Sequence, residues 1–162
     1  MHGPILVGTH GSETSRLAIE EAGLLSKGTG RSVVLVFVRH TRLAGLSALG
    51  AGGLGVAVEN EALDAQQCVA EAQGIAILDP VGAGWRFEVR TGDPATELMR
   101  AARDCGATVI VVAGRRHGAL GGMACGSVCS HLLHRWPHSL LVIHRPTGAA
   151  GPHAARKLPS GQ

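Results

Sequence analysis

A glycine-rich segment after the apolar run Val109–Ala113 contains the residues best suited to chemistry. Residues 114–118 read Gly-Arg-Arg-His-Gly, and Gly126 and Ser127 follow at the expected start of a helix. Glycine lets the backbone approach a ligand closely, and the N–H groups at a helix N-terminus attract anions. The pattern therefore predicts a phosphate-binding loop between a buried strand and a helix.

Arg115, Arg116 and His117 form the one dense basic group of the sequence. Two interpretations remain open, because the group is either a solvated loop or a source of positive potential beside a bound phosphate. The other arginines are spread along the chain, and aromatic residues make up only 2% of it. Without a basic stripe or aromatic side chains for base stacking, we expect no nucleic-acid partner.

Cysteines and histidines near the end of the chain raise the hypothesis of a zinc site. The candidates are Cys125, Cys129, His131, His134 and His138, and Cys and His at short spacings are the usual zinc ligands. Cys129 and His131 lie two positions apart on an expected helix, however, and residues with that spacing do not face each other. We therefore expect packed thiols and solvated histidines here, and no metal.

The sequence offers little support for catalysis. It has no Gly-x-Ser-x-Gly elbow, no Gly-x-x-x-x-Gly-Lys phosphate loop and no pair of carboxylates clustered on one expected element. We interpret Ser127 as a helix-capping and phosphate-contacting residue rather than a nucleophile. His10 has the chemistry of an acid or base near neutral pH, but stabilising a turn is the commoner role. We expect no catalytic residue.

The elements that must hold these residues follow from apolar periodicity. The predicted strands are Pro4–Gly8, Ser32–Val38, Trp85–Thr91, Val109–Ala113 and Ser139–His144. The predicted helices begin after Ser12, span Val56–Leu78 with fraying near Gly74, begin at Pro94 behind the cap Asp93, and span Ser127–Arg135. Residues 39–55, rich in Leu, Ala and Gly, are predicted to be a loop of the kind that covers ligands.

Five strands alternating with four helices predict a doubly wound α/β fold, with a parallel sheet and helices on both faces. In such sheets ligands bind beyond the carboxyl ends of the strands, at the point where the strand order reverses. The turn that contains His10 and the segment Gly114–Ser127 then meet at one edge, although they are far apart in the sequence.

The chain of 162 residues suits one domain, which we place at residues 1–145. Residues 146–162 are rich in Pro, Gly, Ala and Arg and are predicted to be a disordered tail. No apolar run approaches the ~20 residues that a membrane helix needs, so we expect no membrane partner. The four cysteines show no disulfide-framework spacing and we find no secretory leader, which favours reduced thiols and a cytoplasmic location.

Three segments, in this order, resemble the universal stress protein family. Ile5–Ser15, Ile-Leu-Val-Gly-Thr-His-Gly-Ser-Glu-Thr-Ser, is similar to the first strand and turn of the family, and Arg90–Leu98 is similar to its Gly-Asp-Pro-Ala helix start. Val109–His144 is similar to the segment in which ATP-binding members carry Gly-x-x-Gly, nine residues and then Gly-Ser or Gly-Thr. The resemblance implies a Rossmann-like fold of the adenine-nucleotide α-hydrolase type, with five strands in the order 3-2-1-4-5.

For function, the resemblance implies a stress-response protein that binds ATP, ADP or AMP and forms a homodimer through the last strand. Sites in the family use the first turn, a backbone group at the end of the second strand, the glycine loop and the Gly-Ser helix start. Val38 would act through its peptide groups at the adenine edge, because its side chain neither donates nor accepts hydrogen bonds. The nucleotide-binding residues carried over are Thr9, His10, Val38, Gly114, Gly118, Gly126, Ser127 and Val128. The basic loop residues Arg115 and His117 of this chain are added to the predicted site.

The sequence departs from the family pattern in the first turn and in the loop. His10 stands where the family has Asp, and an imidazole does not reproduce a carboxylate as a metal ligand, which argues against magnesium dependence. His117 stands at the second glycine, and the segment from Gly114 to Gly126 is one residue shorter than the family spacing. The positive potential of Arg115, Arg116 and His117 would compensate for backbone N–H groups that the shorter loop displaces.

Two functional hypotheses from different classes remain. The first is a stress-response protein that binds ATP or ADP at the glycine loop and acts as a nucleotide-dependent dimeric regulatory module, with at most slow ATP hydrolysis. The second is a nucleotide-free dimeric interaction module of the same fold. The glycine loop favours the first, whereas His10 and the shortened loop favour the second. An enzyme of the wider adenine-nucleotide α-hydrolase group is a weaker third, because we identify no residues for a substrate pocket.

Overall fold

A computed structural model describes residues 3–40, 54–114 and 126–145 of the chain. Its five strands form one sheet in the order β3-β2-β1-β4-β5, and every pair of neighbours is parallel. The doubly wound fold and its strand order are therefore confirmed. The elements are β1 (Ile5–Thr9), α1 (Glu13–Thr29), β2 (Val33–Arg39), α2 (Leu54–Val81), β3 (Trp85–Thr91), α3 (Pro94–Cys105), β4 (Val109–Gly114), α4 (Ser127–Arg135) and β5 (Ser139–His144).

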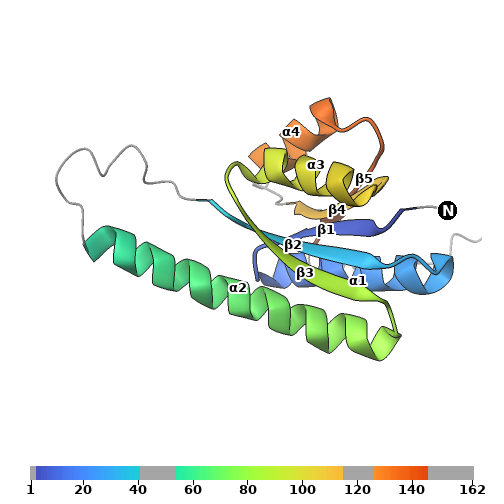
Figure 1. Ribbon diagram of the computed structural model, residues 1–162, viewed down its shortest axis with the longest axis horizontal. Helices are drawn as coiled ribbons and strands as arrows, with labels where there is room; N and C mark the ends of the chain where they lie inside the picture. Colours follow the sequence, from blue (N-terminus) through green and yellow to red (C-terminus); the bar gives the residue numbers. More distant parts are fainter. Residues whose placement is uncertain (1–2, 41–53, 115–125, 146–162) are drawn as a thin grey trace, which may run out of the picture.

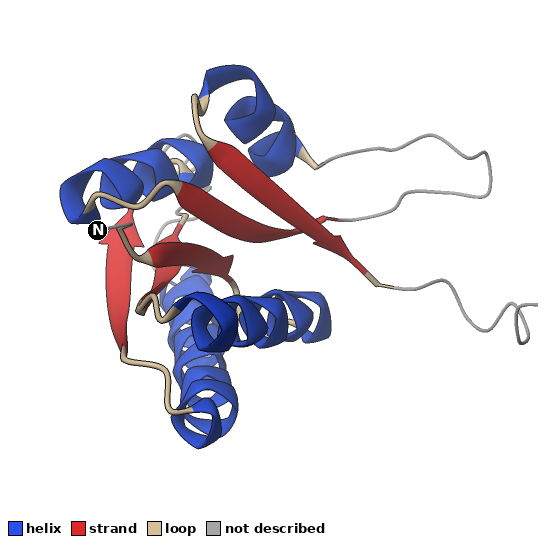
Figure 2. Ribbon diagram, turned by 90° about the vertical axis from the view of Figure 1, so that its right-hand side faces the viewer, coloured by secondary structure: helices blue, strands red, loops and turns tan. Residues whose placement is uncertain are grey.

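Helices cover both faces of the sheet (Figure 1), with α1 and α2 on one face and α3 and α4 on the other. Figure 2 shows the same layers after a quarter turn. Consecutive residues of β1 belong to different cores, because Leu6 packs in the cluster under α3 and α4 and Val7 in the cluster under α1 and α2. A central strand buried on both faces needs apolar residues at every position, which explains the continuous apolar runs.

The predicted caps Ser12 and Asp93 begin α1 and α3. The Ser12 hydroxyl accepts a hydrogen bond from a backbone N–H three residues later at 3.2 Å, and the Asp93 carboxylate accepts one from the Thr96 N–H at 2.9 Å. Both helices end at a glycine in the left-handed conformation, Gly30 with φ 67° and Gly106 with φ 68°. Ser and Asp at the start of a helix and glycine at its end are favoured, because each satisfies backbone groups that the helix itself leaves unpaired.

Helix α2 is longer than the sequence predicts. It spans Leu54–Val81 rather than residues 56–78, and it continues through Gly74 without a break. A Cβ atom added at Gly74 would lie 2.8 Å from the ring of Trp85 and 2.9 Å from Leu35 Cδ2. The expected fraying was wrong, because the missing side chain lets α2 lie directly on the sheet, and this packing offsets the low helix propensity of glycine.

The loop expected at residues 39–55 is shorter than predicted at both ends. β2 begins and ends one residue later than expected, so that Arg39 is its last residue, and α2 already begins at Leu54. Residues 41–53 lie outside the described residues, as does the tail predicted for residues 146–162. Among the helices that the structure describes, none is long and apolar enough to cross a membrane.

The edge strand β3 carries apolar side chains on one face and an ion-pair group on the other. Trp85 and Phe87 pack against the cluster under α1 and α2. On the face toward α3, the guanidinium of Arg90 lies 3.2 Å from Glu88 Oε2 and 2.9 Å from Asp104 Oδ2. Burial opposes the charge of Arg90, but the hydrogen bonds to Asp104 and Glu88 outweigh it and raise the pKa of Arg90.

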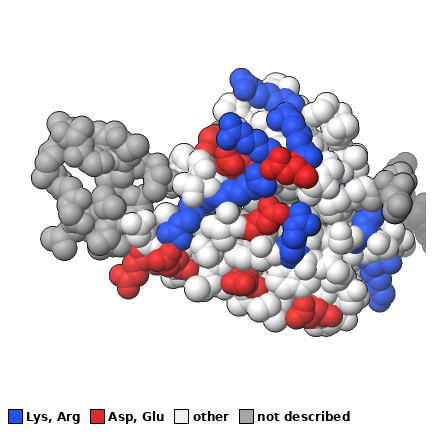
Figure 3. All heavy atoms as spheres, viewed as in Figure 1, with Lys and Arg blue, Asp and Glu red and all other residues white. Residues whose placement is uncertain are grey.

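Helix α2 is the acidic part of the molecule. Its 28 residues include five Asp and Glu and no Lys or Arg. Acidic side chains lie along the lower edge in Figure 3, where α2 runs, while arginines and acids are interspersed above it over β3 and α3. The basic character of the chain, with a formal net charge of +3, therefore resides outside α2.

Candidate functional site

Several predicted site residues lie at the carboxyl ends of strands or at a helix start, whereas Arg115, His117 and Gly118 lie outside the described residues. Thr9 is the last residue of β1 and Gly114 the last residue of β4, and these strands are direct neighbours, with Gly8 opposite Val112. From β1 the chain adds β2 and β3 on one side of the sheet and β4 and β5 on the other. The strand order therefore reverses between β1 and β4, which is where α/β sheets of this kind bind ligands.

The first turn is held by its own threonine and by α2. Thr9 is buried, and its hydroxyl accepts a hydrogen bond from the Gly11 N–H at 3.3 Å. Gly11 has φ +77°, and a Cβ added there would lie 2.7 Å from the carbonyl oxygen of Gln66 in α2. The Gln73 side chain of α2 also donates to the Gly11 carbonyl at 3.4 Å. This fixed turn presents His10 at the surface, where the residue is exposed.

Helix α4 begins at a glycine beside the end of β4. Gly126 is the N-cap residue, and among the described residues no side chain caps the helix and no atom lies within 4 Å of a Cβ added at Gly126. Ser127 is exposed, whereas Val128 packs against the core cluster under α3 and α4. The Cys129 thiol donates to the Ala113 carbonyl at 3.6 Å and so joins the first turn of α4 to β4. The positive end of the α4 dipole thus lies at the carboxyl edge of the sheet.

Gly114 is buried, and its position requires glycine for a packing reason that the sequence does not reveal. It lies opposite His144 in the β4–β5 register. A Cβ added at Gly114 would lie 2.7 Å from Val142 Cγ1 and 2.7 Å from His144 Nδ1. The first glycine of the loop is therefore needed for the close approach of β5, in addition to any approach of a ligand.

Val38 lies one residue inside the end of β2, paired with Arg90 of β3. β1 ends opposite Phe37, so β2 extends beyond its neighbour on that side. At the strand end, the Gly92 N–H donates to the Arg39 carbonyl at 3.1 Å. The Gly92 carbonyl lies 3.2 Å from Nδ1 of His40, a residue that the sequence analysis did not select.

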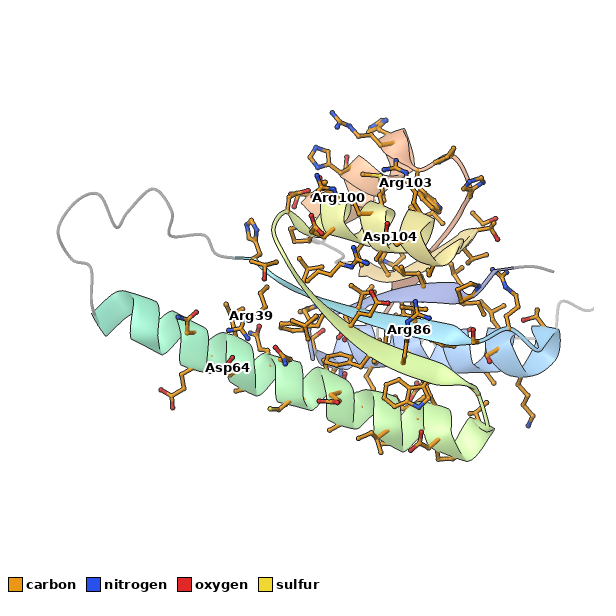
Figure 4. The ribbon with its side chains drawn as sticks, in the orientation of Figure 1. Arg39, Asp64, Arg86, Arg100, Arg103 and Asp104 are labelled. Atoms are coloured by element: carbon orange, nitrogen blue, oxygen red, sulfur yellow. The ribbon has the colours of Figure 1, made fainter. Side chains whose placement is uncertain are left out.

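Arg39 is a second residue that sequence reasoning missed. Its guanidinium lies 2.6 Å from Asp64 Oδ1 and 3.0 Å from Gln67 Oε1, and Figure 4 shows it reaching from β2 toward α2. The side chain is only 23% exposed. An arginine directly after a buried apolar strand was the available signal, but its partners 25 and 28 residues later in α2 were not identifiable without the fold.

Asp93, the cap of α3, lies after β3 at the carboxyl edge of the sheet, and its pKa is lowered. The hydrogen bond from the Thr96 N–H is the largest cause that lowers the pKa of Asp93, followed by the bond from the Thr96 hydroxyl. Partial burial acts in the opposite direction, and the charges of His131 and His40 lower the pKa further. The carboxylate is thus influenced by side chains of α3 and α4 and by His40, the residue after β2.

The zinc candidates are not brought together in the part of the chain that the structure covers. Cys129 is buried, His131 and His134 are exposed, and His138 packs edge-on against the ring of Trp136, with centroids 5.2 Å apart. Within the described ranges, no group of three or more His, Cys, Asp or Glu is arranged to hold a metal ion. The fifth zinc candidate, Cys125, lies outside those ranges. The predicted loop residues Arg115, Arg116, His117 and Gly118 also lie outside them.

The fold is shared with several solved universal stress proteins. UspA from Lactobacillus plantarum has a TM-score of 0.67 and 18% identity, over 88% of this chain and 99% of that chain. A universal stress protein in complex with cAMP has a TM-score of 0.66 and 20% identity, over 89% of this chain and 99% of that chain. The protein from Archaeoglobus fulgidus in complex with dAMP has a TM-score of 0.60 and 16% identity, over 88% and 98%.

Sequence comparison gives the same result at the level of the family. Comparison with curated proteins finds no significant match. The model of the universal stress protein family matches residues 1–144, which include every described element from β1 to β5. The chain therefore belongs to the universal stress protein family.

Proposed function

We propose that the protein binds an adenine nucleotide at the carboxyl edge of the sheet and acts as a nucleotide-dependent dimeric regulatory module in a stress response. The glycine start of α4 beside the end of β4, which no side chain of the described residues caps, carries this proposal. Two relatives with the same fold form complexes with cAMP and dAMP, which supports an adenine nucleotide as the ligand class. ATP, ADP and AMP are the ligands to compare.

The α4 start is suited to a phosphate group. The first N–H groups of a helix lack intrahelical partners, and among the described residues neither a side-chain cap nor an acidic residue in the first turn competes for them. A Cβ added at Gly126 would meet no described atom within 4 Å, and the exposed Ser127 adds a hydroxyl donor. The first turns of α1 and α3 differ, because each has a side-chain cap and an acidic residue.

The nucleoside would lie across the ends of β1 and β2. β2 extends beyond β1 by Val38 and Arg39, so peptide groups on that side have no strand neighbour and are available to the adenine edge. The turn with Thr9 and His10 would contact the ribose, and a neutral imidazole offers one donor and one acceptor. Because His10 is not a carboxylate, we propose that affinity does not depend on magnesium.

The dimer would form through β5. In the described sheet β5 pairs only with β4, so its outer edge has no strand neighbour. Its apolar residues Leu140 and Val142, on the face toward α3 and α4, are only half-buried, whereas the central strand β1 is almost fully buried. A second copy placed along this edge would cover them and pair the free backbone groups.

Calorimetric titration tests the ligand, and light scattering after size exclusion tests the dimer. We expect micromolar affinity for ATP or ADP, the same with and without magnesium, and the mass of two chains. AMP and GTP are the comparison ligands for phosphate number and base. Absence of both heat and thermal shift with every adenine nucleotide would overturn the proposal and leave the nucleotide-free dimeric interaction module. A single-chain mass would contradict the dimer.

A further inference from the structure

His144 is the last residue of β5, and its ring lies against the last residue of β4. Gly114 is its register partner, and both Nδ1 and Cε1 of the imidazole lie within 3 Å of the position that a Cβ of Gly114 would occupy. The edge of the ring that contains Nδ1 and Cε1 therefore faces the Gly114 Cα. Val142, two residues earlier on the same face of β5, closes the other side of this contact.

Packing rather than hydrogen bonding holds this edge of the ring. His144 Nδ1 is buried and has no hydrogen-bond partner among the described residues. A buried polar atom without a partner costs free energy, so the nitrogen gives no reason for the ring to stay there. Shape does, because glycine leaves room for the ring and any larger residue at position 114 would occupy the same space.

We propose that His144 is a positioning residue of the nucleotide site, acting through Gly114. Its ring fixes the position of Gly114 at the end of β4, next to the first turn of α4. Cys129 in that turn donates to the carbonyl of Ala113, the residue before Gly114, so the start of α4 is linked to the end of β4. This inference rests on the nucleotide site proposed above, and His144 itself touches no ligand.

The same strand provides a matched control. Ile143 precedes His144 and packs on the opposite face of the sheet, against the cluster under α1 and α2. His144→Ala removes the ring beside Gly114, whereas Ile143→Ala removes a core side chain at the same end of β5. If His144 were merely structural, both variants would lower the thermal midpoint and leave nucleotide affinity unchanged.

Nucleotide titration of four variants separates ring shape from polar chemistry. We expect His144→Ala and His144→Asn to weaken nucleotide binding at least tenfold, and His144→Phe to restore affinity to within about threefold of the wild type. Ile143→Ala should lower the thermal midpoint and leave affinity unchanged. Wild-type affinity in His144→Ala, or an equal loss in His144→Phe and His144→Ala, would overturn the inference.

A second measurement does not need the ligand and so separates this inference from the proposed function. In nucleotide-free protein, His144→Ala should shift the amide NMR resonances of Gly114, Gly126 and Ser127, and Ile143→Ala should not. Unchanged resonances in His144→Ala would overturn the positioning role even if the wild type binds nucleotide. If the resonances shift in His144→Ala but the wild type binds no nucleotide, the proposed function is rejected. The positioning role of His144 at the end of β4 is then retained.

Discussion

The Asp93 carboxylate accepts two hydrogen bonds from Thr96, one from the backbone N–H at 2.9 Å and one from the hydroxyl at 2.7 Å. The pair fixes the start of α3 directly after the end of β3, where Gly92 contacts both Arg39 and His40 of the neighbouring strand region. The cap therefore contributes both to the stability of α3 and to the shape of the carboxyl edge.

Asp93→Ala should lower the free energy of unfolding by about 1 kcal/mol, because it removes an N-cap. Urea denaturation measures this loss. Asp104→Ala is the control on the same helix, since its exposed carboxylate pairs with Arg90 but caps nothing, and we expect a loss below about 1 kcal/mol there. A larger loss in Asp104→Ala than in Asp93→Ala would contradict the role given to the cap.

The lowered pKa of Asp93 predicts a pH dependence with a defined sign. The folded state binds the Asp93 proton less tightly than the unfolded state, whose pKa is close to the ordinary 3.8. The stabilisation is fully present above that value and is lost as the pH falls through the lower folded pKa. The stability difference between the wild type and Asp93→Asn should therefore be constant near neutral pH and shrink in acid. A difference that grows on acidification would reverse the assigned sign.

Two glycines in helices should respond in opposite directions to alanine. Gly74→Ala places a Cβ 2.8 Å from the ring of Trp85, and such overpacking typically costs about 1–3 kcal/mol. Gly28 is exposed in α1 and has no atom within 4 Å of an added Cβ, so Gly28→Ala should stabilise by about 0.5–1 kcal/mol. Paired urea titrations test this contrast, and a neutral Gly74→Ala would show that α2 can move away from the sheet.

Gly126→Leu should abolish nucleotide binding and leave the fold and the dimer intact. Gly126 has φ −54° and ψ 164°, a conformation open to any residue, and no described atom lies within 4 Å of its new Cβ. The side chain would instead fill the space in front of the α4 N–H groups. Gly28→Leu is the control, because that position belongs to the far end of α1. Unchanged affinity in Gly126→Leu would reject the phosphate-binding role of the helix start.

The fold could be predicted from the sequence where local signals mark both ends of an element. The bounds of β3, α4 and β5 agree with the prediction at each residue, because glycines, Asp93 and Pro137 delimit them. The bounds of α2 were less accurate, since no capping residue was recognised at its start. Gly74 was misinterpreted because the reason for it, the ring of Trp85, lies in another element.

The candidate site shows the same division between local and long-range information. The glycine start of α4 was readable because a helix end is a local feature. The contact between His144 and Gly114 depends on the register of two strands, and the link from Arg39 to Asp64 depends on how α2 lies on the sheet. Contacts that depend on tertiary packing could not be predicted from the local sequence.

The charge distribution of α2 has a consequence for how the molecule behaves at a distance. Since α2 carries five carboxylates and no Lys or Arg, the rest of the chain must carry a formal charge of +8 to give the total of +3. Outside α2, the described residues include ten Lys and Arg against seven Asp and Glu, so the described part of the molecule has opposite net charges on α2 and on the remainder. An anionic surface would repel α2 over the ~8 Å that physiological salt leaves unscreened. Orientation, and not only net charge, would then decide which face meets a charged neighbour first.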